Sequence, residues 1–168
     1  MTHFPQPAAY VRAPSPLGPM MLAATDRGLC GLWFTDGQKY LPPFDSWTAE
    51  AADHPVLRDA AAQLAQYFDG RRTTFGLPLD LAAGTAFQQS VWQALLAIPT
   101  GGTTSYGALS RAIGKPQAMR AVGAAIGRNP ISIVVPCHRV IGADGTLTGY
   151  AGGLDRKSAL LRLEGVLH

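Results

Sequence analysis

One cysteine in the sequence has neighbours that can change its reactivity. Cys137 is followed directly by His138 and Arg139, and it comes shortly after an apolar run at residues 131–135. A thiolate is a strong nucleophile, and a nearby imidazole or guanidinium lowers the pKa of the thiol. A buried structural thiol is the commonest state of a free cysteine, but such a thiol needs neither neighbour. Cys137 is therefore the candidate nucleophile.

The second cysteine, Cys30, lies in an apolar run at residues 29–33 and fits a structural role. The two cysteines could form a disulfide, but we expect reduced thiols in an intracellular chain. The sequence has four histidines: His3, His54, His138 and His168. None of them lies at a metal-ligand spacing from a cysteine or a carboxylate. The sequence therefore predicts no metal site and no cofactor.

Two polar residues near predicted helix ends are candidates to support the thiol. Asn129 precedes Pro130, and the ordinary explanation for an asparagine at this position is that it ends a helix. Alternatively, if its side chain is buried, its amide could hold two turns together. Glu164 lies at the end of the last predicted helix, where a negative charge opposes the helix dipole. This placement favours a cationic partner, for which His138 is a candidate, although an exposed carboxylate there costs little.

The N-terminal sequence predicts a small sheet and one helix. Three β-prone runs alternate with turn-rich sequence and predict a meander: residues 8–13, 20–24 and 29–34. A helix is expected from Pro55, which suits a first helical position, to Gly70. Its apolar residues recur at i, i+3, i+4 and i+7. Residues 80–84 are the best candidate for a linker.

The C-terminal sequence predicts a set of short helices. Thr85-Ala86-Phe87-Gln88 matches a capping box, and Pro99 ends the helix that it begins. Residues 105–113 and 117–126 predict two helices around a turn, an arrangement that looks like a helix-turn-helix. The apolar run at residues 131–135 is expected to be extended. A last helix is expected at residues 155–164.

The two faces of the predicted helix at residues 117–126 differ in character. The side expected in the core holds Met119, Val122 and Ile126. The opposite side is small in its middle and polar or basic at its ends: Gln117, Arg120, Ala121, Ala124 and Arg128. A flat alanine surface lets a helix approach a nucleic-acid backbone, and a long arginine from it could insert between bases. An ordinary exposed helix, with small residues that favour helix formation, explains the same pattern.

A glycine-rich turn and an uneven charge distribution also bear on nucleic-acid binding. Thr104 and Ser105 end the turn at residues 101–105, which precedes a helix and could hold a phosphate; a turn that simply begins the helix is sufficient. Residues 1–80 have a net charge of −2 and residues 81–168 a net charge of +5. A basic half favours a polyanionic partner, and a solvated basic surface is the alternative.

Length and composition limit the remaining possibilities. With 168 residues, 47% hydrophobic and 15% charged, the chain can form one domain or two small ones with a packed core. It has no run of about 18 apolar residues, so we expect no transmembrane helix and no membrane partner. Residues 1–19 lack the continuous apolar region of a signal peptide. We therefore expect the chain in the cytoplasm.

The motifs together resemble one family. Pro136-Cys137-His138-Arg139-Val140, preceded by Asn129-Pro130 and followed by the glycine-rich residues 149–153, resembles the O6-alkylguanine-DNA alkyltransferases, especially the bacterial Ogt-like members. Further matches extend over nearly the whole chain: Ser15-Pro16-Leu17-Gly18, Phe87-Gln88, Val91-Trp92, Ser105-Tyr106-Gly107, Arg120-Ala121-Val122-Gly123 and Leu163-Glu164-Gly165.

The resemblance implies an α/β protein with two domains. The first, residues 1–80, would be a small ribonuclease H-like domain of antiparallel sheet plus helix. The second, residues 81–168, would be a mainly helical, winged-helix-like domain with a helix-turn-helix that binds DNA and accepts the alkyl group. The implied partner is double-stranded DNA with alkylated bases. We expect a monomer in free solution, with cooperative assembly on DNA as a further possibility.

The resemblance also implies a role for each site residue in the transfer of an alkyl group from O6-alkylguanine, or from O4-alkylthymine. Cys137 would accept the group irreversibly, and His138 would act as its base through a bridging water. Glu164 would orient and charge the imidazole, and Asn129 would brace the turn. Tyr106 would push the target phosphate and give a proton to the departing guanine.

Other residues would contact the DNA. Arg120 would fill the gap that the flipped base leaves. Main-chain groups of Cys137 and of three pocket residues would contact the base edges: Val140, Tyr150 and Ala151. Ala151 replaces a serine of some relatives, which removes one side-chain hydrogen bond. The N-terminal zinc ligands of other relatives are missing.

Two further classes of protein use some of the same features. A DNA-binding regulator without chemistry would need the same helices, and alkyltransferase-like lesion binders carry tryptophan at the position of Cys137. A Cys–His hydrolase would need an oxyanion hole and turnover. Incubation with an alkylated oligonucleotide separates these hypotheses, because only an alkyl acceptor gains mass covalently.

Overall fold

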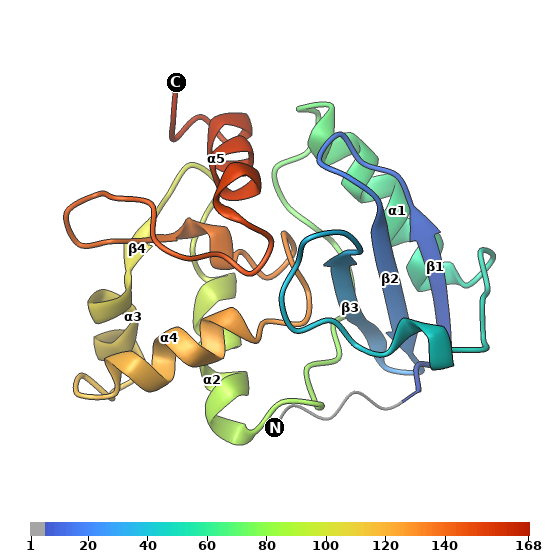
Figure 1. Ribbon diagram of the computed structural model, residues 1–168, viewed down its shortest axis with the longest axis horizontal. Helices are drawn as coiled ribbons and strands as arrows, with labels where there is room; N and C mark the ends of the chain where they lie inside the picture. The colour runs from blue at the N-terminus through green and yellow to red at the C-terminus, as the bar shows by residue number, and fades with distance from the viewer. Residues whose placement is uncertain (1–5) are drawn as a thin grey trace.

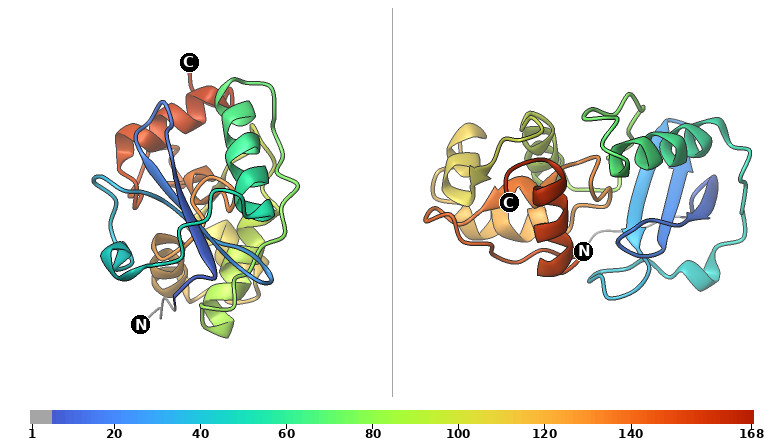
Figure 2. Two further views of the ribbon diagram at one scale, coloured as in Figure 1. Left: turned by 90° about the vertical axis from the view of Figure 1, so that its right-hand side faces the viewer. Right: turned by 90° about the horizontal axis from the view of Figure 1, so that it is seen from above.

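The computed structural model describes residues 6–168, and His3 lies outside that range. Its N-terminal part (residues 6–80) is built on an antiparallel sheet in the order β1-β2-β3 (Figure 1). The strands are β1 (Ala9–Ala13), β2 (Met20–Thr25) and β3 (Gly28–Phe34). The helix α1 (Pro55–Phe68) lies across one face of this sheet, as the view from above shows (Figure 2).

The C-terminal part (residues 81–168) is mainly helical and lies beside the sheet (Figure 1). Its helices are α2 (Ala86–Leu96), α3 (Tyr106–Ala112), α4 (Met119–Gly127) and α5 (Leu154–Leu163). Two short strands pair in parallel, β4 (Thr104–Ser105) and β5 (Val140–Ile141). The prediction of an α/β protein, with a small antiparallel sheet and helix followed by a helical part, is confirmed.

Local sequence signals place the helix starts. The Thr85 hydroxyl accepts a hydrogen bond from the Gln88 backbone N–H at 3.1 Å, and the Gln88 side chain accepts one from the Thr85 backbone N–H at 3.0 Å. This is the capping box that the sequence predicts. Pro55 occupies the first turn of α1, and the Ser105 hydroxyl caps α3 by accepting from Ala108 N–H. These starts hold α2 and α3 in place beside α4.

The apolar run at residues 131–135 is not extended, and that expectation was wrong. Ile131 makes a single bridge to Leu32 of β3, and the chain then turns, so that the Val135 backbone N–H donates to the Ile131 carbonyl at 3.0 Å. Ile133 takes a positive φ of 71°. Every residue of the run is buried, and burial on all sides suits a packed turn as well as a strand.

Two other expectations need adjustment. Met119 was expected in the core but is half exposed, because α4 begins at this residue, two residues later than expected, and the first turn of α4 extends past the core. Val122 and Ile126 are buried as expected. Asp80 is not free in a linker: its backbone N–H donates to the Leu29 carbonyl at 2.8 Å. A domain boundary after residue 80 stays a prediction.

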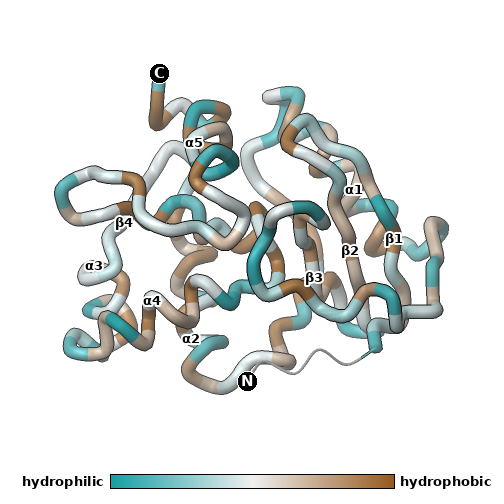
Figure 3. The backbone as a smooth tube through the Cα atoms, viewed as in Figure 1, coloured by the Kyte–Doolittle hydropathy of each residue, from teal (hydrophilic) through white to brown (hydrophobic). Residues whose placement is uncertain are grey.

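One hydrophobic core passes through both parts of the chain. It joins Leu22 and Leu32 of the sheet to Ile131, and it continues into α2 and α4. The Trp92 indole N–H, on α2, donates to the Ala125 carbonyl of α4 at 2.8 Å. Figure 3 shows hydrophobic colours along the strands and hydrophilic colours on the outer loops. The sheet therefore supports the segment that carries Cys137.

Within residues 6–168, the structure has no helix that is both long and apolar enough to cross a bilayer.

Candidate active site around Cys137

Cys137 begins a single 3-10 turn (Cys137–Arg139) between the packed run and β5. Its side chain reaches a pocket of about 310 Å³ and is otherwise buried. The turn places His138 and Arg139 on the inner side, both buried. Cys137 thus follows a buried apolar run, as the sequence indicates, but this run is not the extended segment that was expected.

Asn129 holds the Cys137 turn together through both ends of its amide. Its Nδ2 group donates to the Val135 carbonyl at 2.7 Å and to Cys137 Sγ at 3.1 Å, and its Oδ1 accepts from Ile131 N–H at 3.0 Å. The side chain is buried, so these bonds form where water does not compete for the donors. Asn129 therefore does more than end a helix: it fixes the position of the sulfur.

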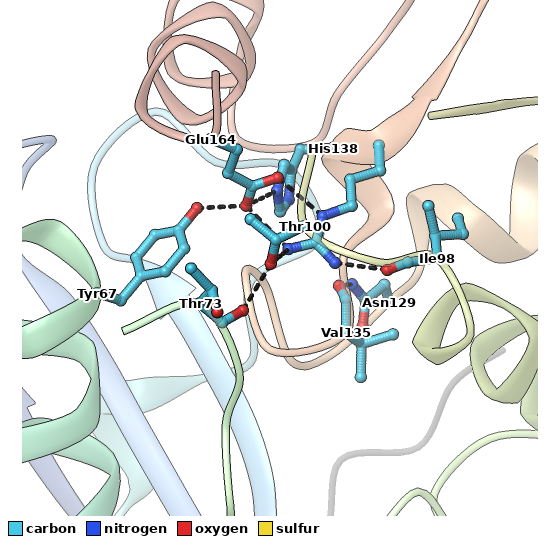
Figure 4. Close-up of polar contacts among 9 residues, drawn as sticks. Tyr67, Thr73, Ile98, Thr100, Asn129, Val135, His138 and Glu164 are labelled. Atoms are coloured by element: carbon cyan, nitrogen blue, oxygen red, sulfur yellow. Dashed lines mark hydrogen bonds and ion pairs between the residues drawn. The ribbon is translucent and has the colours of Figure 1, made fainter. Parts of the chain in front are cut away.

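The His138 side chain, in the Cys137 turn, forms a buried pair with Glu164 (Figure 4). The distance between His138 Nε2 and Glu164 Oε2 is 2.8 Å. An ionised carboxylate only accepts hydrogen bonds, so Nε2 carries the proton and Nδ1 keeps its lone pair. Nδ1 is buried and has no hydrogen-bond partner among the described residues. The pair therefore leaves the basic atom of the imidazole available.

Three further donors reach the Glu164 carboxylate. Arg139 Nε donates to Oε1 at 2.8 Å, and Arg139 Nη2 donates to Oε2 at 3.0 Å. The Tyr67 hydroxyl, from α1, donates to Oε2 at 2.6 Å. Burial alone raises the pKa of Glu164, but the hydrogen bonds from His138, Arg139 and Tyr67 lower it to about 2. Glu164 is thus an anion at neutral pH.

The thiol and the imidazole are both neutral in the resting protein. Burial raises the pKa of Cys137 to about 11, although the Asn129 amide and the Lys157 charge lower it in part. Burial also lowers the pKa of His138, and the Glu164 carboxylate opposes that shift. Glu164 orients His138 through the Nε2 contact, and the expectation that it also charges the imidazole stays a prediction.

Lys157 is a functional candidate that sequence reasoning missed. Its ammonium is fully buried on α5 and donates to the carbonyls of Val140 at 2.6 Å and Thr148 at 2.9 Å, with Gly149 at 3.5 Å. Burial lowers its pKa to about 8. Lys157 therefore joins the strand after the Cys137 turn to the glycine-rich loop, and it places a positive charge near the thiol.

The pocket at Cys137 is lined by both parts of the chain. Tyr150 and Ala151, two of the three residues expected to contact the base, line it, and the third, Val140, does not. Tyr106, Gly127, Lys39 and Tyr40 also line it. The Tyr106 hydroxyl accepts from the Thr148 hydroxyl at 3.0 Å. The backbone N–H of Lys39 donates to the Ala151 carbonyl at 2.9 Å. A loop of the N-terminal part thus forms one wall, which the sequence did not indicate.

The outer face of α4 carries most of the residues expected to contact DNA. Arg120, Ala121 and Ala124 are exposed on it, and Gln117 is exposed just before it. Arg128, at the C-terminal end of α4, is half-buried, and its guanidinium lies 3.7 Å from the centre of the Tyr40 ring. The flat, exposed alanine surface agrees with the sequence prediction for this helix.

Fewer polar groups are available for DNA contacts at Thr104, Ser105 and Val140 than the sequence suggested. Thr104 and Ser105 are half-buried in β4, beside Val140 and Ile141 of β5. The Ser105 hydroxyl is used by the α3 cap. The Val140 carbonyl already accepts from Lys157, so one lone pair remains for a further contact.

Some of the missed residues left a signal in the sequence. Lys157 lies three and four residues before Leu160 and Leu161, and so shares their apolar helix face. A charged residue on such a face indicates a buried, paired group. Tyr67 lies on the apolar stripe of α1 and needs a partner for its hydroxyl, but nothing local indicates Glu164.

Cys30 does not line the pocket at Cys137. Cys30 is half-buried, and burial and the nearby Asp80 charge raise its pKa to about 12. Among residues 6–168, no group of three or more histidine, cysteine, aspartate or glutamate side chains is placed to hold a metal ion.

A buried thiol, backed by an Asn–His–Glu cluster and set beside an exposed helix-turn-helix, defines a nucleic-acid-binding protein with a nucleophilic cysteine. Comparison with protein families makes the class specific. Residues 9–81 match the ribonuclease-like domain of 6-O-methylguanine DNA methyltransferase, and residues 86–166 match its DNA binding domain. The chain belongs to the 6-O-methylguanine DNA methyltransferase family, as the resemblance implied.

Individual relatives are similar over almost the whole chain. A methylated-DNA–protein-cysteine methyltransferase of Methanosarcina acetivorans is 49% identical over 93% of this chain and 97% of its own. One of Mycobacterium leprae is 52% identical over 89% of this chain and 88% of its own. The crystal structure of Mycobacterium tuberculosis OGT in complex with DNA has a TM-score of 0.83 and 49% identity, over 93% of this chain and 92% of that one.

Proposed function

We propose that this protein repairs DNA directly, by moving the alkyl group of O6-alkylguanine to Cys137 in a single, self-inactivating turnover. The observation that carries the proposal is the Cys137 turn, in which Asn129 contacts the sulfur and the buried His138–Glu164 pair lies behind it. The similarity to methylated-DNA–protein-cysteine methyltransferases supports the same reaction. O4-alkylthymine is a second substrate of the same chemistry.

The reaction is a displacement at carbon. Cys137 Sγ attacks the alkyl carbon, a C–S bond forms, and the bond from that carbon to O6 breaks. The thiol proton passes through a bridging water to His138 Nδ1, the free acceptor of the imidazole, while Glu164 holds Nε2–H. Guanine leaves as the neutral base, because the Tyr106 hydroxyl supplies a proton as negative charge develops. The proton held by His138 then returns through solvent to the Tyr106 oxygen, so both side chains end neutral. The thioether product has no leaving group, so the protein does not turn over.

The DNA is bound on the outer face of α4. An alkyl group on O6 lies within the base stack, so the nucleotide must rotate out into the pocket at a cost of a few kcal/mol. The exposed alanines allow close approach to the backbone, and Arg120 fills the space in the stack. Further contacts come from Gln117 and Arg128, from Thr104 and Ser105 to a phosphate, and from main-chain groups at Val140, Tyr150 and Ala151 to the base.

The partner is double-stranded DNA with alkylated bases, and the M. tuberculosis relative solved in complex with DNA supports this assignment. We further propose that the protein acts in the cytoplasm, is a monomer in free solution and is able to assemble cooperatively on DNA. The two domains are residues 1–80 and 81–168. The break between the two family matches, after residue 81 and before residue 86, supports this division.

The intact mass of the chain after exposure to duplex DNA containing O6-methylguanine tests the proposal. We expect a gain of one methyl group per chain, located on Cys137, and none in Cys137→Ser. Cys30→Ser is the matched control and should gain the methyl group at the normal rate. Binding without a gain of mass would indicate a regulator, and release of product with continued turnover would indicate a hydrolase; either result contradicts the proposal.

A further inference from the structure

Glu164 is held by a residue from the other part of the chain. Tyr67 lies on α1, 97 positions earlier in the sequence, and its hydroxyl donates to Glu164 Oε2 at 2.6 Å (Figure 4). The Tyr67 ring is buried and packs against Phe68 and Phe75, with ring centres 5.4 Å apart in both cases. The ring is therefore fixed, and the hydroxyl has one direction in which to donate.

The oxygen that accepts from Tyr67 also accepts from His138. His138 Nε2 lies 2.8 Å from Glu164 Oε2. Hydrogen bonds to a carboxylate stabilise its charged form and share out its charge. The Tyr67 bond consequently weakens the pull of Glu164 on the imidazole proton, while it fixes the position of the oxygen. Burial raises the pKa of Tyr67 far above its usual value, so the hydroxyl remains a donor at every working pH.

A second connection joins the same cluster to the N-terminal part. The Thr100 hydroxyl donates to the Thr73 carbonyl at 2.6 Å and accepts from Arg139 Nη2 at 3.1 Å (Figure 4). Arg139 in turn donates to both oxygens of Glu164. The carboxylate is thus positioned from α1 on one side and from the segment after α1 on the other.

We propose that Tyr67 is a positioning residue of the alkyl-transfer site, through which the N-terminal domain sets the proton affinity of His138. The inference rests on the proposed function of Cys137 as the alkyl acceptor. It gives the N-terminal domain a part in the chemistry, in addition to its packing against the Cys137 segment. Other charged or titratable groups face the pair and stay unchanged in the test: Cys137, Arg139, Tyr150 and Lys157.

The test is Tyr67→Phe in the full chain, with Tyr10→Phe as the matched control. Both tyrosines are buried in the N-terminal part and use the hydroxyl in one hydrogen bond; that of Tyr10 goes to the Trp47 carbonyl at 3.3 Å. The rate of alkyl transfer from an O6-alkylguanine supplied as the free base is measured against pH, so that DNA binding does not enter.

Loss of the Tyr67 hydroxyl concentrates the Glu164 charge on His138 and raises the pKa of the imidazole. We expect the acidic limb of the rate profile, where His138 must be neutral to act as the base, to move upward by about half a pH unit to one unit. Tyr10→Phe should leave the limb in place. An unmoved limb in Tyr67→Phe, or one moved to lower pH, would overturn the inference, even if the rate fell uniformly.

A second measurement separates this inference from the proposed function. Titration of the His138 imidazole by ¹⁵N NMR, without any substrate, reports the pKa and the protonated nitrogen directly. An upward shift in Tyr67→Phe supports the positioning role, and an unchanged titration contradicts it. If the unaltered chain takes no alkyl group at all, the proposed function fails, while this titration still decides how Tyr67 acts on His138.

Discussion

Replacing Glu164 by glutamine should destabilise the protein far more than the loss of an ordinary carboxylate. Glu164 accepts hydrogen bonds from Tyr67, His138 and Arg139. In Glu164→Gln the amide NH₂ takes the place of one oxygen and faces a donor. If its oxygen keeps the crowded Oε2 position, the Nε–H of Arg139 loses its acceptor in a buried site.

The magnitude follows from the pKa of Glu164, which falls from 4.5 to about 2 in the folded protein. One pKa unit corresponds to about 1.4 kcal/mol, so the ionised carboxylate contributes about 3.5 kcal/mol to the free energy of unfolding at pH 7. Solvent screens little of this, because the side chain is 1% exposed. A lowered carboxyl pKa stabilises the fold above about pH 4.5, and this stabilisation is lost as the pH falls toward 2.

The assay is urea unfolding of both proteins at pH 7 and at pH 3. The difference in unfolding free energy should be about 3.5 kcal/mol at pH 7 and clearly smaller at pH 3. Asp69→Asn is the control, because Asp69 forms an exposed pair with Arg71 and should change stability by less than about 0.5 kcal/mol. The alkyl-transfer rate should also fall about 100-fold. A Glu164→Gln protein as stable as Asp69→Asn at pH 7 would refute the reasoning.

Three other substitutions give independent tests. Arg120→Ala should slow repair of duplex DNA much more than reaction with a free alkylated base, with the exposed Arg162→Ala as control; equal losses on both substrates would contradict the stack-filling role. Asn129→Ala leaves buried backbone groups without partners, so the free energy of unfolding measured in urea should fall by about 3 kcal/mol. A loss below about 1 kcal/mol would mean that the turn is stable without the Asn129 hydrogen bonds. Lys157→Met removes a positive charge that is present below the Lys157 pKa of about 8 and that favours the thiolate, so the rate of Cys137 alkylation by iodoacetamide at pH 7 should fall; an unchanged rate would show that Lys157 only bridges carbonyls.

Features fixed by short-range interactions could be predicted from the sequence. The capping box at Thr85 and the proline at the start of α1 act within one helical turn, so the helix starts agree with the structure. The apolar run at residues 131–135 has no such signal. An apolar residue is compatible with a strand and with a buried turn alike, and the hydrogen bonds of Asn129 to both ends of the run hold it in the turn.

The site could be predicted only in part, for a related reason. Cys137 and His138 are adjacent in the sequence, and their residue types alone indicate their chemistry. The bond from Tyr67 to Glu164 joins positions 97 apart, and the wall that Lys39 and Tyr40 give to the pocket comes from a different part of the chain. Such contacts depend on how the sheet packs against the Cys137 segment, which no local pattern specifies.

The hydrophobic core that passes through both parts of the chain limits how far they can be treated as modules. Leu32 of β3 and Ile131 beside the Cys137 turn belong to one cluster, and the Leu32 backbone N–H also donates to the Pro130 carbonyl at 2.9 Å. Separation of the parts would expose apolar surface on each of them. A chimera that carries the first 80 residues of a relative would fold well only if the residues around Ile131 that pack against them were also taken from that relative.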